Sequence, residues 1–114
     1  MNIALVLFAL AAVGGLVLAS QRLKGQPQPA LPLALIHGAA AAAGLVTLIL
    51  FVMGAGGVAS YATTGLAIMV VAALGGFLLF SFHLRGKPLP IPIMIVHALV
   101  AVAGFLVLLF GALG

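Results

Sequence analysis

Apolar residues form four long runs along the chain, and the Lys and Arg residues are confined to the short segments between them. The runs cover residues 2–20, 32–53, 61–82 and 92–113. Each is close to the roughly 20 apolar residues that a helix needs to cross the hydrocarbon core of a bilayer. The runs are too long for strands and show no polar alternation. The pattern therefore predicts an all-α membrane protein with four transmembrane helices, antiparallel to their neighbours in an up-down-up-down bundle.

The three connections differ in charge. All four Lys and Arg residues lie in the segments 21–31 and 83–91, and the middle segment 54–60 has none. Cytoplasmic loops carry an excess of Lys and Arg, so we expect both basic connections in the cytoplasm and both termini outside, in a bacterial inner membrane. The first run lacks the basic start of a signal peptide, so we expect it to remain as a membrane helix.

Composition narrows the possible functions. The chain has 114 residues, of which 67% are hydrophobic and 4% charged. A soluble domain carries about 25% charged residues, so the composition excludes a soluble enzyme and a free-standing nucleic-acid-binding protein. Asp, Glu and Cys are absent from the sequence, which removes carboxylate acid–base chemistry and thiolate chemistry. We therefore expect a membrane protein that is not an enzyme.

The sequence matches itself. The stretch 14–20 (GGLVLAS) recurs as 75–81 (GGFLLFS). The first basic connection is longer than the second by one residue. Beyond the connections the offset between the copies is therefore shorter by one residue, and there His37 matches His97. Self-similarity at a fixed period indicates repeated structural units.

These matches predict one transmembrane domain, 1–114, built from two tandem helical hairpins. Repeat one covers 1–53 and repeat two covers 61–114. Because both copies start on the same side of the membrane, we expect a pseudo-two-fold axis along the membrane normal.

His37 and His97 are the only histidine, lysine or arginine residues inside the four runs. Each lies five residues after a proline that opens its run, which places both about 8 Å below the membrane boundary at 1.5 Å per residue. In a square bundle the second and fourth helices face each other across a diagonal of roughly 12–14 Å. Two imidazoles can span that gap toward a metal held between them, such as the iron of haem b.

Other residues fit a haem at this level. Small residues on the first and third helices reach a similar depth, and small residues follow each histidine on one helical stripe. The basic connections lie where haem propionates would emerge, and His83, which aligns with Arg22, belongs to the same cationic set. The predicted cofactor-binding residues are Gly14, Gly15, Arg22, Lys24, Ala41, Gly44, Gly75, Gly76, Arg85, Lys87, Ala101 and Gly104, with His37 and His97 as metal ligands.

Each of these features also has a structural explanation. A buried histidine is often only hydrogen-bonded, small residues favour helix packing in membranes, and basic loops set topology. Zinc is a weaker candidate because two histidines are an incomplete tetrahedral ligand set. A chlorophyll-type pigment stays open, since one axial histidine is sufficient for it.

Three functions follow from these observations. The first is a small haem b protein that transfers electrons, as a subunit of a larger membrane complex. The second is a cofactor-free accessory subunit that contacts only lipid and other membrane subunits. The third is a small transporter. Length and number of spans are similar to the small multidrug resistance family, but that family depends on a membrane-embedded Glu in its first helix, and this sequence has none.

Overall fold

Four helices form the bundle in the computed structural model, which describes residues 1–54 and 59–114. They are α1 (Asn2–Leu23), α2 (Leu31–Met53), α3 (Ser60–Leu84) and α4 (Ile91–Leu113). All four are long and apolar enough to cross a membrane, which confirms the prediction of four helices of that kind. Within the described residues no strand is present. Most of the predicted middle connection, 54–60, lies outside the described residues.

The helix ends differ only slightly from the ends of the apolar runs, and the larger differences lie at the basic connections. α1 continues to Leu23 and α3 to Leu84, because the polar residues that leave the apolar core still complete the last helical turn. Gly25 and Gly86 follow with positive φ values of 106° and 66°, a conformation that glycine adopts without steric cost. Prolines in the first turn of α2 and α4 then start the next helices.

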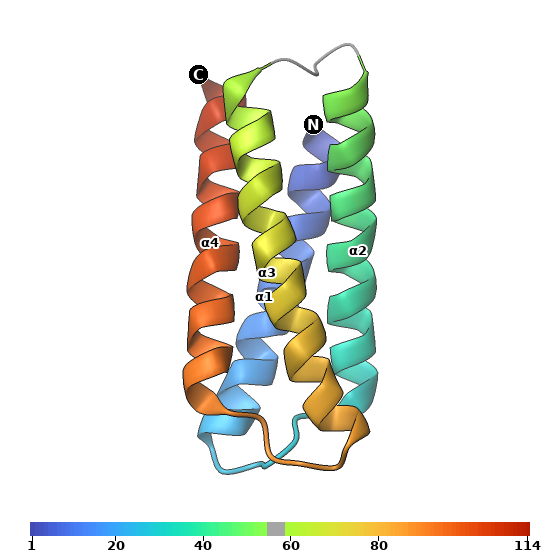
Figure 1. Ribbon diagram of the computed structural model, residues 1–114, viewed down its shortest axis with the longest axis vertical. Coiled ribbons are helices and arrows are strands. Elements are labelled where there is room, and N and C mark those ends of the chain that lie inside the picture. Colours follow the sequence, from blue (N-terminus) through green and yellow to red (C-terminus); the bar gives the residue numbers. More distant parts are fainter. Residues whose placement is uncertain (55–58) are drawn as a thin grey trace.

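The helices run alternately up and down, with consecutive helices side by side (Figure 1). α1 packs most extensively on α2 and α3 on α4, while the two hairpins contact each other less, through α2 with α3 and α1 with α4. In the described residues α2 and α4 therefore face each other across a diagonal. The connections 24–30 and 85–90 cross at one end, which we call the basic end, and both chain ends lie at the other (Figure 1).

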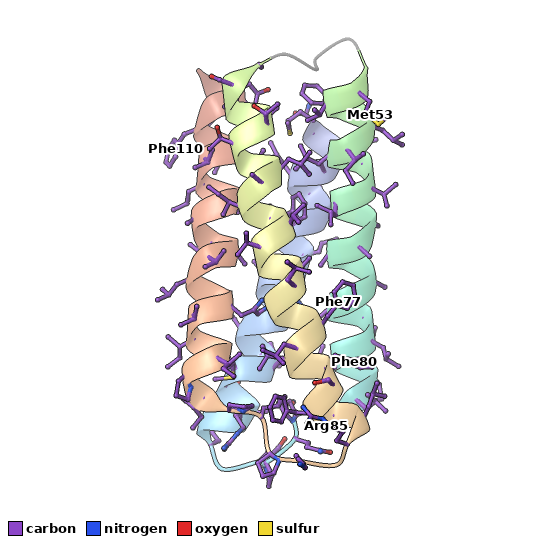
Figure 2. The ribbon with its side chains drawn as sticks, viewed as in Figure 1. Met53, Phe77, Phe80, Arg85 and Phe110 are labelled. Atoms are coloured by element: carbon purple, nitrogen blue, oxygen red, sulfur yellow. The ribbon has the colours of Figure 1, made fainter. Side chains whose placement is uncertain are left out.

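Packing differs along the bundle axis. Away from the basic end, the buried side chains of Ala4, Phe8, Leu48, Met69 and Leu108 form one cluster. At the basic end, Leu79, Leu89 and Met94 form a second, smaller cluster. The outer surface is apolar along its length, with Met53, Phe77 and Phe110 among the residues that project outward (Figure 2). Such a surface is suited to contact with lipid.

Candidate functional site

The imidazoles of His37 on α2 and His97 on α4 lie close together inside the bundle. Their ring centroids are 6.4 Å apart and their planes are nearly perpendicular, at 88°. Both side chains are half-buried. The structure therefore brings together, from two helices that share a diagonal, the two residues that the sequence predicts as a ligand pair.

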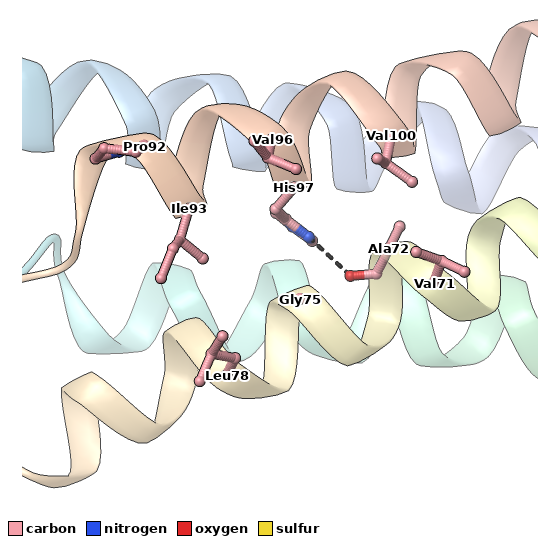
Figure 3. Close-up of a pocket in the computed structure, with 9 residues that line it drawn as sticks. All are labelled: Val71, Ala72, Gly75, Leu78, Pro92, Ile93, Val96, His97 and Val100. Atoms are coloured by element: carbon pink, nitrogen blue, oxygen red, sulfur yellow. Dashed lines mark hydrogen bonds between the residues drawn. The ribbon is translucent and has the colours of Figure 1, made fainter.

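Each imidazole is fixed by one hydrogen bond to the neighbouring helix of its own hairpin. Nδ1 of His37 donates to the carbonyl of Ala11 at 2.7 Å, and Nδ1 of His97 donates to the carbonyl of Ala72 at 2.8 Å (Figure 3). A carbonyl can only accept, so both rings carry their proton on Nδ1, and in a neutral ring Nε2 keeps its lone pair. Metal-ligating histidines commonly have this arrangement, in which the second nitrogen bonds a backbone carbonyl.

The glycine pairs on α1 and α3 make room for these rings. A Cβ atom added to Gly15 would lie 3.0 Å from Cε1 of His37, and one added to Gly76 would lie 3.2 Å from Cε1 of His97. Gly14 and Gly75 lie against the same two histidines. A larger residue at Gly15 or Gly76 would require the adjacent imidazole to shift. These four glycines are thus at the predicted depth, and each lies against the imidazole of its own hairpin.

Further from the basic end, side chains fill the space beside the small residues that follow each histidine. A Cβ on Gly44 would lie 2.9 Å from the ring of Phe8, and one on Gly104 would lie 2.7 Å from the sulfur of Met69. Ala41 and Ala101 are half-buried. Gly44 and Gly104 therefore allow close packing within each hairpin, and their role beside a cofactor stays a prediction.

The basic connections are joined through side chains that reach from one to the other. Nε of Arg22 donates to the carbonyl of Leu89 at 2.8 Å, and Nε2 of His83 donates to the carbonyl of Pro29 at 2.9 Å. Both side chains are half-buried. Arg22 and His83 thus each bond the opposite connection. The sequence places these two residues at equivalent positions of the two copies.

The remaining cations are exposed. Lys24, Arg85 and Lys87 lie on the outside of the basic end. Arg85 folds back onto α3, where its Nε and Nη2 donate to the backbone and the hydroxyl of Ser81. The four cations that the sequence groups together therefore have different hydrogen-bond partners. Arg22 bonds the other connection, and Arg85 bonds its own helix.

Sequence reasoning missed the backbone acceptors and the crossing of the connections. The carbonyls of Ala11 and Ala72 have no residue-specific signal, because any residue supplies a carbonyl. Leu89 is 5% exposed, and its N–H donates to the carbonyl of Pro27 on the other connection at 3.0 Å. One signal was present, since Leu89 is a large apolar residue between two prolines in a connection that otherwise faces water.

An apolar groove lies beside His97, between α3 and α4. Its volume is about 410 Å³, and Figure 3 shows the residues that line it. The lining residues are Val71, Ala72, Gly75, Leu78, Pro92, Ile93, Val96, His97 and Val100.

Within residues 1–54 and 59–114, no group of three or more His, Cys, Asp or Glu side chains comes together as a metal site. The histidine pair offers two protein ligands, which is the number of axial positions that a haem iron leaves to the protein. Comparisons with protein-family models, curated proteins and solved structures give no match to this chain.

Proposed function

We propose that the chain binds haem b between His37 and His97 and acts in electron transfer within the membrane, as a small subunit of a larger complex. The observation that supports this most is the facing imidazole pair, with each Nδ1 hydrogen-bonded to a carbonyl and each Nε2 left to bind a metal. Two neutral nitrogen donors from opposite helices would hold the iron of a haem.

The ring separation supports the proposal. A metal–imidazole nitrogen bond is about 2.0 Å, and the ring centre lies roughly 1 Å further, so two axial imidazoles place their centroids about 6 Å apart. The observed 6.4 Å is close to this value. A planar ring between the imidazoles would lie between the two hairpins, where the helices contact each other less than they do within each hairpin.

The chain's own residues would hold and orient the group. The carbonyls of Ala11 and Ala72 fix the ring orientations, and the glycines behind each ring let the helix approach. The side chains predicted to bind the propionates, Arg22, Lys24, Arg85 and Lys87, lie at the end where propionates would emerge. Of the basic side chains at this end, Arg22 and His83 are half-buried. A bound haem supplies one-electron redox chemistry, and with both axial positions taken by histidine a substrate site at the iron is disfavoured.

We also propose that the two hairpins are tandem repeats related by a pseudo-two-fold axis along the membrane normal. The hydrogen bonds of the two hairpins support this, because they occur at matching positions. The carbonyl acceptors Ala11 and Ala72 are separated by the offset that relates the copies before the basic connections, and so are the donors Arg22 and His83. The acceptors of these two donors, Leu89 and Pro29, each lie in the opposite connection.

We place the basic end in the cytoplasm of a bacterial inner membrane, on the charge bias of the connections. The bundle is 44 Å long, which is close to the thickness of a bilayer with its headgroup regions.

The test of the function is a reduced-minus-oxidised absorbance spectrum of the protein purified from cells supplied with haem. We expect the α-band of a haem b and one haem per chain. A colourless preparation would contradict the proposal and would favour a cofactor-free accessory subunit, which should then copurify with a larger complex in a fixed ratio.

A further inference from the structure

The groove between α3 and α4 faces the surroundings of the bundle and runs toward the basic end. Its α3 side extends from Val71 to Leu78, about 10 Å at 1.5 Å per residue. Its α4 side begins at Pro92, in the first turn after the basic connection. One leaflet of the hydrocarbon core is roughly 15 Å deep, so a groove of this length follows much of a single hydrocarbon chain.

An exposed cation, Arg85, directly follows the end of α3. Phe82 and Arg85 follow Leu78 at spacings of four and three residues, which are typical of one helical face. The guanidinium of Arg85 lies 4.4 Å from the centre of the Phe82 ring and bonds Ser81 through two of its five N–H donors. Arg85 is thus held in place while its side chain stays exposed.

We propose that this groove and Arg85 form a binding site for an anionic phospholipid, with an acyl chain along the groove and the phosphate on the guanidinium. The lining is apolar apart from the edge of His97, which suits a hydrocarbon chain and disfavours a polar ring such as a quinone head. The sequence has no carboxylate to neutralise Arg85, which favours an anionic over a zwitterionic headgroup.

The first hairpin offers a natural control. Lys24 is the counterpart of Arg85 in the first copy and is also exposed. Gln21 stands where the second copy has Phe82, and its side-chain oxygen accepts the N–H of Ala30. The first connection therefore has a cation of equal charge but no aromatic ring beneath it.

The experiment is native mass spectrometry of the purified protein with equimolar phosphatidylglycerol and phosphatidylcholine that carry identical acyl chains. We expect the wild type to retain phosphatidylglycerol preferentially. Arg85→Gln should lower that preference about fivefold, which is the contribution expected from one cation close to an anionic headgroup. Lys24→Gln should change the preference by less than about twofold.

A second pair of variants tests the groove. Val71→Phe should fill it and lower the retention of both lipids, whereas Val13→Phe, at a similarly exposed position on α1, should not. Equal effects of Arg85→Gln and Lys24→Gln would overturn the proposal in favour of diffuse attraction. Full lipid retention by Val71→Phe would overturn the groove as the chain site.

Discussion

The two halves of the bundle pack in different ways. The half away from the basic end, which we call the packed half, is closed by the cluster of Ala4, Phe8, Leu48, Met69 and Leu108. The half next to the basic end, the histidine half, contains two imidazoles against four glycines, and a groove beside one of them. In a membrane, helix association depends on close packing and on internal hydrogen bonds.

The two halves differ in the kind of side chain that lies against their small residues. Small residues occur in both halves, but in the packed half apolar side chains cover the glycines, as Phe8 covers Gly44 and Leu108 covers Gly65. In the histidine half the side chain that covers the glycine is ionisable and has a nitrogen to offer. We infer that the packed half holds the helices in register and that the histidine half gives up some packing to bind a ligand.

The largest expected effect on stability is in the packed half. Phe8 is 5% exposed, so Phe8→Ala should lower the free energy of unfolding by about 2 kcal/mol. This is less than the roughly 3–5 kcal/mol expected in a soluble core, because the separated helices are already in lipid. The measurement is unfolding in a dodecyl sulfate titration. Leu10→Ala, at a position 60% exposed, is the control and should change little. Equal losses in both variants would remove the distinction between core and lipid-facing positions.

A smaller effect on stability, but a larger one on the ligand, is expected from Gly15→Val. The added side chain meets Cε1 of His37, so it should displace the imidazole and cost about 1 kcal/mol of overpacking. Haem retained after purification should fall severalfold. Gly38→Ala is the control, because nothing lies within 4 Å of a Cβ at Gly38. Unchanged haem content in Gly15→Val would show that the glycine serves packing alone.

The smallest effect is expected where the connections cross. Arg22→Gln removes the hydrogen bond to the carbonyl of Leu89 and should cost about 0.5 kcal/mol, because the side chain is only half-buried. Lys24→Gln has the same charge change and should have no measurable effect in the same titration. A larger loss in Lys24→Gln would mean that net charge at the basic end, rather than this contact, sets the stability.

The sequence was sufficient for the helices because a membrane span is defined by length and hydropathy. The four predicted runs agree with α1 to α4, and the pairing of α2 with α4 across the diagonal follows from short connections. The helical residues beyond the apolar runs, up to Leu23 in α1 and Leu84 in α3, were not predictable from hydropathy. Hydropathy locates the membrane boundary rather than the last helical hydrogen bond.

The candidate site was only partly predictable. Depth and helical face bring His37 and His97 together, as expected. The directions of Arg22 and Arg85 could not be predicted, since one bonds the other connection and the other bonds its own helix. The contact of the Phe8 ring with Gly44 was also not predictable, because it depends on how Phe8 packs from the neighbouring helix. Such choices follow from tertiary packing and leave no periodic trace in the sequence.

The most direct test of the central claim is the ligation state of the bound haem in three single variants. We expect a six-coordinate, low-spin spectrum for the wild type and for His83→Ala, because His83 bonds the carbonyl of Pro29 at the basic end. His37→Ala and His97→Ala should each lose the low-spin signal. Low-spin haem that persists in either of these two variants, or that disappears in His83→Ala, would contradict ligation by His37 and His97.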